Sequence, residues 1–424
     1  MKRKIEESLL KWKKDVDKKP LLIYGNKQVG KTYTVLKFGE ENYKNIVYFN
    51  TENNIEIYKI FKKERIIDRI ISRLTILSSE SILEEDTLIV FDNVNDVDVV
   101  NGIKLFGRNK NNYHIILITS IKENLKNFKG EELQYRMMGI VDFEEYLVAI
   151  NNGHLIDFIN SSFRNNKPMP FHSLALEYFE DYLMTGGMPE AVELSIKEKN
   201  RLLLSSVYDK VIDTYKKEIS MLDNLIDITR SIEVLDSVPF QLQKANKKFQ
   251  YGLIKTGGRS KEYEKSISFL YNNGFVYKSH KIAEVKFPLS SCKDPDNFKL
   301  YLNDTGILFS KMYLNKTKFL SDDKIKNTIL ENAIAIFLIN SGFNLYYYQS
   351  EGKAEVSFVV QTRMGKVIPI EIVNKNMSKA KALTLFMNKF DLKEAIRVTE
   401  DNFSYKKGIK YIPMYALFCL RDYL

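Results

Sequence analysis

The residues with the clearest chemical meaning form a loop between an apolar run and a helical stretch. They are Gly25, Asn26, Lys27, Gln28, Val29, Gly30, Lys31 and Thr32, which fit the pattern G-x-x-x-x-G-K-[ST]. Backbone N–H groups of such a loop surround phosphate oxygens, and the helix that follows presents its positive end to the same anion. We expect this loop and the adjoining Tyr33 to bind a nucleoside triphosphate. Lys31 would reach the β- and γ-phosphates, and Thr32 would ligate Mg²⁺.

A second acidic element is expected to help hold the metal. The apolar run Leu88–Phe91 ends at Asp92, the position from which a carboxylate contacts Mg²⁺ through a water in proteins with this loop. The alternative is an ordinary strand-end aspartate that caps a turn. With the phosphate-binding loop accepted, we interpret Asp92 as a metal-site residue.

The residue after Asp92 argues against fast hydrolysis. ATPases with an additional central strand usually place Glu here to polarise the attacking water, whereas this chain has Asn93. An amide can orient a water but cannot accept its proton. Asp96 is close in sequence but should lie beyond the strand end. The sequence predicts strong binding with slow or absent hydrolysis, unless another acid substitutes.

Two further polar residues are candidates for the same site. The strand expected at Tyr113–Thr119 is followed by Ser120, which could hydrogen-bond the γ-phosphate or the water, or could simply cap the strand end. Arg136 could act on the nucleotide of a neighbouring subunit. A solvated surface arginine is the alternative.

The elements that position these residues follow from hydrophobic patterning. Continuously apolar strands separated by helical stretches predict a parallel sheet with helices on both faces, which we assign to residues 1–145. The expected strands are Leu21–Tyr24, Asn45–Phe49, Thr87–Phe91 and Tyr113–Thr119, with one long helical stretch at Ile55–Leu77.

The remainder divides into three expected parts. Residues 146–231 are a helical region interrupted by the breaker cluster Thr185–Pro189. Residues 232–310 suggest a winged-helix-like module. Residues 311–424 suggest a further α/β domain, with a helix at Asn327–Asn340 and strands at Asn344–Gln349, Ala354–Gln361 and Lys366–Val373.

Length and composition limit the number of domains, the kinds of site and the location of the protein. The 424 residues suffice for two to three domains, and the two cysteines cannot build a disulfide framework or a cysteine-rich zinc site. The N-terminus lacks an apolar signal core, and no uninterrupted apolar run is long enough to span a membrane. We therefore expect a cytoplasmic protein without a membrane partner.

The formal net charge of +10 favours contact with nucleic acid. The best candidate for DNA or RNA contact is the basic region 244–265, with Phe249 and Tyr251 interleaved. Its cations are Lys244, Lys247, Lys248, Lys255, Arg259, Lys261 and Lys265. The alternative is a solvated face with two core aromatics.

Several segments together resemble prokaryotic ATPases of the AAA+ superfamily that carry a C-terminal domain of unknown function. The segments are Trp12, Gln28–Thr32, Tyr48–Asn50, Phe91–Asp92, Phe143–Leu147, Gly186–Glu190 and Phe298–Gly306, which span nearly the whole chain. The resemblance implies an AAA+-like P-loop NTPase fold with ATP and Mg²⁺ as ligands. The choice of ATP over GTP rests on this resemblance alone.

The same resemblance implies that the C-terminal domain is similar to PD-(D/E)xK nucleases, with a restriction-endonuclease-like fold and metal-binding carboxylates. Glu331, Glu355 and Glu371 stand at or near the expected acidic positions. Ser357 replaces the strand aspartate, and Val373 replaces the lysine. Lys375 could be a migrated lysine, and Glu355 could partly replace the lost carboxylate. We expect a degenerate, structural nuclease fold, because a neutral Ser is a poor ligand for a hard cation.

The function that the sequence favours is a nucleotide-dependent switch that acts on a protein or nucleic acid. Three alternatives stay open at this point: an active ATPase that remodels a partner, an ATP-gated metal-dependent nuclease, and a nucleic-acid-binding regulator without enzymatic activity. Assembly into an oligomer is compatible with each of them.

Overall fold

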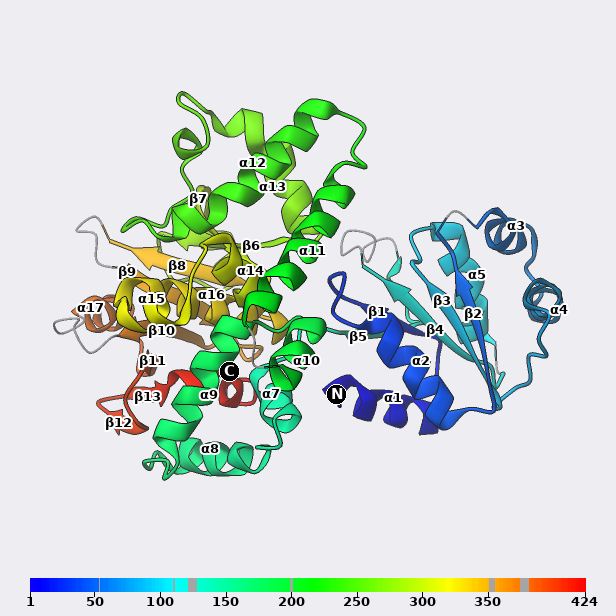
Figure 1. The fold of residues 1–424 in the computed structure, drawn as a ribbon, viewed down its shortest axis with the longest axis horizontal. Coiled ribbons are helices and arrows are strands. Elements are labelled where there is room, and N and C mark those ends of the chain that lie inside the picture. The colour runs from blue at the N-terminus through cyan, green and yellow to red at the C-terminus, as the bar shows by residue number, and fades with distance from the viewer. Residues whose placement is uncertain (53, 110, 121–127, 199–200, 351–354, 374–380) are drawn as a thin grey trace. The chain divides into compact units, whose positions relative to one another are not determined.

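The protein is described by a computed structural model that covers residues 1–424 except 53, 110, 121–127, 199–200, 351–354 and 374–380. Figure 1 shows its helices and strands. The chain divides into two compact units. The first comprises residues 1–140 with 272–274, and the second comprises residues 141–271 and 275–424.

The first unit is built on a parallel sheet, as the sequence predicted, and the sheet has five strands where four were expected. Its strands are β1 (Leu21–Tyr24), β2 (Asn45–Asn50), β3 (Thr87–Asp92), β4 (His114–Thr119) and β5 (Gln134–Met137), in the order β2-β3-β4-β1-β5. Strands β3 and β4 are buried along their whole length, which explains why they are continuously apolar. The edge strand β5 was not predicted, because it has four residues and is partly exposed.

Helices cover both faces of this sheet (Figure 1). They are α1 (Lys4–Lys14), α2 (Lys31–Asn42), α3 (Ile55–Lys63), α4 (Ile67–Ser78) and α5 (Val97–Arg108). Side chains alternate between the faces, as the period of a strand requires. Ile89 and Phe91 join a core with α3, α4 and α5, whereas Leu88 lies against Gly39 of α2.

The stretch Ile55–Leu77 forms two helices where the sequence suggested one. Glu64 ends α3 in an extended conformation, and Ile66 begins α4 from another extended residue. The Glu64 carboxylate pairs with Arg73 of α4 at 2.8 Å. The amphipathic pattern continues across the break, so periodicity alone does not reveal it.

The second unit begins with a run of helices, which extends beyond the end of the predicted helical region at residue 231. They are α7 (Phe143–Ala149), α8 (His154–Asn165), α9 (His172–Thr185), α10 (Pro189–Lys197), α11 (Arg201–Ile219), α12 (Leu225–Leu242) and α13 (Ser260–Asn272). Later helices are α14 (Thr305–Lys311), α15 (Lys316–Ser321), α16 (Asp323–Asn340) and α17 (Lys381–Lys389), with short 3₁₀ turns at Tyr251–Leu253, Leu289–Cys292 and Met414–Leu420. None of the described helices is both long and apolar enough to cross a lipid bilayer.

These helices pack with a mixed eight-stranded sheet. Its strands are β6 (Val276–Ile282), β7 (Lys293–Leu302), β8 (Leu345–Gln349), β9 (Glu355–Gln361), β10 (Val367–Val373), β11 (Ala395–Thr399), β12 (Ser404–Lys406) and β13 (Ile409–Pro413). Their order is β12-β13-β11-β10-β9-β8-β6-β7. Because the β6–β7 hairpin pairs through β6 with β8, the predicted boundary at residue 310 falls inside one unit. A separate winged-helix module is not confirmed.

Two segments that carried the family resemblance meet in the second unit. The buried Asp304 carboxylate accepts hydrogen bonds from the backbone N–H of Gly187 at 2.7 Å and of Ile307 at 3.0 Å. A Cβ on Gly306 would lie 2.2 Å from the Tyr208 ring, so only glycine fits there. The breaker cluster at Thr185–Pro189 is therefore a packing junction with the start of α14.

Candidate nucleotide-binding site

The loop between β1 and α2 has the backbone that phosphate binding requires. Gly30 precedes α2 in the left-handed region, at φ 87°, where glycine is favoured. Gly25 opens the loop, and a Cβ there would lie 2.0 Å from the carbonyl oxygen of Met138. The first N–H groups of a helix have no partner within that helix. The start of α2 at Lys31 therefore offers donors to an anion.

Lys31 spans the loop from inside. Its buried Nζ donates to the carbonyl oxygens of Gly25 at 2.9 Å and Asn26 at 2.8 Å, and to Ser120 Oγ at 3.2 Å. The structure thus brings together Lys31 and the predicted Ser120 from the end of β4. The preceding Thr119 is fully buried, so Ser120 is the residue that this strand presents to the loop.

The Asp92 carboxylate is the polar centre beside the loop. Only 4% of Asp92 is exposed, and its Oδ2 accepts hydrogen bonds from Thr32 Oγ1 at 2.7 Å and from the Tyr48 hydroxyl at 2.9 Å. Its Oδ1 accepts one from the backbone N–H of Asn93 at 2.8 Å. Burial and the bond to Asp92 raise the pKa of Tyr48 to about 12, so this hydroxyl stays a donor at neutral pH.

The residues fit a magnesium ion that is bound together with phosphate. Thr32 Oγ1 is a hard oxygen that would ligate the ion directly, and Asp92 Oδ2, which lies 2.7 Å from it, would contact the ion through a water. Among the described residues, no group of three or more His, Cys, Asp or Glu side chains is placed to hold a metal. Mg²⁺ commonly uses one or two protein oxygens and completes its shell with phosphates and waters, which matches this donor set.

Asn93 lies where the water-polarising acid was expected. It has a left-handed backbone, at φ 56°, a conformation that Asn tolerates better than Glu. Its Nδ2 donates to Asn50 Oδ1 at 3.2 Å. Asp96 does not substitute for it, because its carboxylate caps α5 by accepting from the N–H groups of Asp98 and Val99.

The other predicted residues divide between the loop and its surroundings. Val29 is fully buried and packs in the core, whereas Tyr33 is 68% exposed at the start of α2. Asn26 and Lys27 are half-buried, and Gln28 is exposed with a positive φ. Arg136 lies on β5, where its Nε donates to Ser8 Oγ at 2.7 Å. Its action on a neighbouring subunit stays a prediction.

Sequence reasoning missed Arg3 altogether. Its side chain is 5% exposed, and its guanidinium donates to the carbonyl oxygen of Val29 at 2.8 Å and to that of Gly139 at 2.8 Å. It therefore ties the phosphate-binding loop to the chain that follows β5. Arg3 lies between Lys2 and Lys4, so nothing in the sequence distinguishes it from a solvated charge. Tyr48 was visible only as part of a family signature.

The residues predicted for a nuclease-like site do not form one constellation. Glu331 of α16 and Glu355 of β9 are joined by Lys299 of β7, whose Nζ contacts both carboxylates. Lys299 lies in the segment Phe298–Gly306 that carries the family resemblance, but neither the sequence pattern nor the resemblance assigned it a role at this site.

Glu371 belongs to a different ion pair. Its Oε2 accepts from Arg397 Nε of the adjacent strand β11 at 2.8 Å, and the described contacts do not connect it to Glu331 or Glu355. Burial raises the pKa of Glu371, and the Arg397 guanidinium opposes that shift. Ser357 is half-buried on β9. Lys375 lies outside the described residues.

The predicted nucleic-acid region is smaller than the sequence suggested. Lys247 is largely buried in an ion pair with Glu331, and Phe249 stacks on Phe298 in the core with ring centroids 5.5 Å apart. Lys248 is half-buried, and Lys244 lies over the Phe240 ring. The cations that remain exposed are Lys255, Arg259, Lys261 and Lys265.

Comparison with known families agrees with this geometry. Residues 17–147 match the family described as an AAA domain. Residues 176–318 and 326–417 match two domains of unknown function, DUF8612 and DUF4143. No curated protein matches the chain significantly. The family match and the loop geometry support an AAA-type P-loop ATPase domain in the first unit.

Solved structures show only distant likeness. The Walker-type ATPase PABY2304 of Pyrococcus abyssi is 14% identical, with a TM-score of 0.44, and the match covers 73% of this chain and 95% of that one. The Aeropyrum pernix ORC1 protein in complex with DNA is also 14% identical, with a TM-score of 0.28 and coverage of 78% and 91%.

Proposed function

We propose that the first unit binds ATP with Mg²⁺ and works as a nucleotide-dependent switch that hydrolyses ATP slowly. The observation that carries the proposal is the arrangement around Asp92. Thr32 Oγ1 donates to Asp92 Oδ2 beside a loop with the pattern G-x-x-x-x-G-K-[ST], which supports a site for a triphosphate and Mg²⁺, and Asn93 follows Asp92 where a water-polarising acid would stand. Such a site binds well and lacks a general base.

Each side chain has a role that its present contacts suggest. Lys31 would exchange the carbonyl oxygens of Gly25 and Asn26 for phosphate oxygens. Thr32 would turn its hydroxyl from Asp92 towards the metal, while Tyr48 continues to hold the carboxylate. Mg²⁺, when bound, neutralises charge on the β- and γ-phosphates. Asn93 could orient a water but could not take its proton.

A route for the switch is suggested by the tight contact behind the loop. A Cβ on Gly25 would lie 2.0 Å from the Met138 carbonyl oxygen, and the Met138 N–H donates to the carbonyl oxygen of Tyr24 at 2.8 Å, so the loop and the chain after β5 are in direct contact. Met138 lies two residues before Ile140, where the first unit ends. A loop that tightens around phosphate would therefore displace the chain that leaves the unit, which is how nucleotide sites commonly reposition other parts of a protein.

Phosphate release with variants of Asn93 tests the slow-hydrolysis proposal. We expect wild-type turnover well below ~1 s⁻¹, a typical lower rate for an enzyme. Asn93→Asp supplies a carboxylate that tolerates the left-handed backbone, and should raise turnover by about 100-fold, the lower range for a general base. Asn93→Ala is the control and should not raise it. Wild-type turnover near ~1 s⁻¹ that depends on Lys31 would instead favour a remodelling ATPase.

We also propose a weak nucleic-acid contact through the exposed cations Lys255, Arg259, Lys261 and Lys265. Contacts of this kind bind phosphates without sequence preference and weaken with salt. The double variant Lys255→Ala/Lys261→Ala should lower duplex-DNA affinity in fluorescence anisotropy and reduce the salt slope by about 2, one unit for each phosphate contact. The matched control Lys406→Ala/Lys407→Ala removes the same charge from another exposed site. Equal affinity in both variants would exclude this surface.

A further inference from the structure

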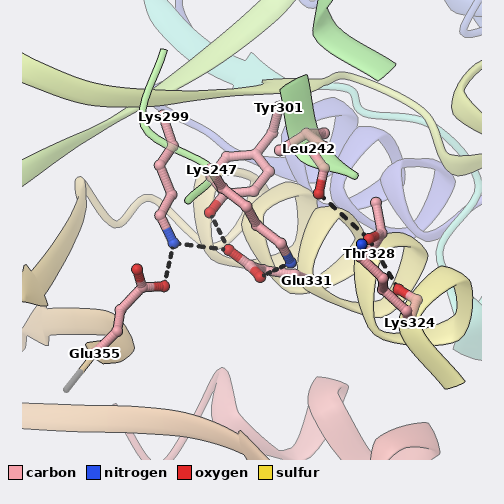
Figure 2. A network of polar contacts seen from close by, with 8 residues as sticks. All are labelled: Leu242, Lys247, Lys299, Tyr301, Lys324, Thr328, Glu331 and Glu355. Atoms are coloured by element: carbon pink, nitrogen blue, oxygen red, sulfur yellow. Dashed lines mark hydrogen bonds and ion pairs between the residues drawn. The ribbon is translucent and has the colours of Figure 1, made fainter. Parts of the chain in front are cut away.

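A lysine lies between two carboxylates in the core of the second unit (Figure 2). Lys299 of β7 is 0% exposed, and its Nζ lies 3.1 Å from Glu331 Oε1 and 2.5 Å from Glu355 Oε1. The carboxylates come from α16 and β9, so three elements far apart in sequence meet at one ammonium group. A buried charge of this kind is stable only when it is paired.

The surrounding groups complete the cluster. Glu331 Oε1 also accepts a hydrogen bond from the Tyr301 hydroxyl at 2.6 Å, and Oε2 pairs with Lys247 Nζ at 2.5 Å. Figure 2 shows these side chains converging on the Glu331 carboxylate. Two carboxylates thus face two ammonium groups, and the cluster is electrically neutral without any bound ion.

A divalent metal does not fit this arrangement. The family resemblance implied metal ligands at Glu331 and Glu355, yet the space between their oxygens is taken by Lys299 Nζ. A divalent ion would add two positive charges to a neutral cluster. It would also have to displace the Lys299 ammonium group, which is 0% exposed and would lose both carboxylate partners. Glu371, the third implied carboxylate, is engaged by Arg397.

The lysine cannot take over a catalytic role at neutral pH. Burial alone would lower the pKa of Lys299, but Glu331 and Glu355 outweigh it and raise the pKa above the usual value. The side chain therefore stays an ammonium cation that donates hydrogen bonds, and it cannot serve as a base.

We propose that Lys299 holds Glu331 and Glu355 together in place of a divalent cation, so that the nuclease-like carboxylates form a metal-free structural cluster. Removing the two lysine charges should then leave the buried Glu331 and the half-buried Glu355 as unpaired carboxylates that recruit a divalent ion. The cluster joins α16, β7 and β9 through Lys299, and it leaves Glu331 and Glu355 without a role in metal-dependent cleavage.

Manganese binding to the full-length protein without nucleotide tests the proposal. The double variant Lys247→Met/Lys299→Met keeps the side-chain volumes and removes both charges. Electron paramagnetic resonance of free Mn²⁺ should show an additional bound ion, with affinity at least about tenfold above the wild type, as expected when two hard carboxylates become free. Adding Glu355→Gln to this double variant should abolish binding of the additional ion. Manganese bound at the phosphate-binding loop is the same in the double and triple variants, so it does not affect this difference.

The wild-type chain provides a second, independent test. The affinity for Mn²⁺ should be the same in the wild type and in Glu355→Gln. Any difference in melting temperature between the two proteins should stay the same when Mn²⁺ is added. Wild-type binding of Mn²⁺ that disappears in Glu355→Gln would overturn the proposal. Metal-dependent cleavage of plasmid DNA lost in the same variant would do so too. A folded double variant that gains no ion would also overturn it.

Discussion

At the residue scale, both polar centres are built around a carboxylate whose oxygens are already occupied. Asp92 accepts from Thr32, Tyr48 and the Asn93 backbone, and Glu331 accepts from two lysines and Tyr301. The difference lies in the partners. Hydroxyl groups can turn away to admit a metal, whereas buried ammonium groups cannot leave without stranding a charge. The first centre is therefore suited to a ligand and the second to structure.

The stability of the second unit should fall in acid because of Glu331. Burial favours the neutral acid, but Lys247 and Lys299 outweigh it and lower the pKa of Glu331 below the value of 4.5 expected when unfolded. Its stabilising contribution is therefore fully present above about pH 4.5 and is lost as pH falls through the lower folded pKa.

We expect the free energy of unfolding to drop more steeply between pH 5 and pH 3 in the wild type than in Glu331→Gln. The difference in slope should approach about 1.4 kcal/mol per pH unit, the value for one proton. Urea unfolding at a series of pH values measures it. Parallel slopes for the two proteins would contradict the assignment.

At the element scale, Arg3, the N-cap residue of α1, connects this helix to the phosphate-binding loop by hydrogen bonding. Replacing it with Met leaves the Val29 and Gly139 carbonyl oxygens without this donor, and hydrogen bonds to charged groups contribute about 1.5–3 kcal/mol each. Arg3→Met should lower the melting temperature of the first unit and weaken ATP binding. Arg3→Lys should restore little of the melting temperature or the ATP affinity, since an ammonium group cannot bridge both carbonyl oxygens as a planar guanidinium does.

The exposed neighbour Lys2 provides the control, because its ion pair with Glu7 is on the surface. Lys2→Met should leave melting temperature and ATP affinity unchanged. Equal effects of the Lys2 and Arg3 substitutions in calorimetry would show that Arg3 contributes only charge.

Elements with strong local signals could be predicted from the sequence. β1, β3, β4 and the loop before α2 have continuous apolar runs or diagnostic glycines. The meeting of Thr32 with Asp92 followed from the parallel sheet, because strand ends share one edge. β5 lacked such a signal, and the break at Glu64 was hidden in an unbroken amphipathic pattern. Arg3 and Lys299 depend on contacts with residues far away in sequence, which residue type cannot reveal.

At the scale of the whole molecule, the sequence suggested four parts and the structure has two compact units. The difference arises at β6 and β8, which pair in parallel although α14, α15 and α16 lie between them in sequence. Local patterning finds such strands but not their partners. Both regions that match domains of unknown function lie in the second unit, apart from residues 272–274.

The central claim is that the loop Gly25–Thr32 binds a nucleoside triphosphate. Titration calorimetry with ATP and Mg²⁺ tests this claim most directly. The wild type should bind with a dependence on Mg²⁺, and Lys31→Ala should weaken binding by at least about tenfold, or about 1.4 kcal/mol. Lys37→Ala, in the same helix, removes ion pairs with Glu6 and Glu41 instead and should bind like the wild type. A wild type without affinity for any purine triphosphate, or unchanged binding in Lys31→Ala, would contradict the account.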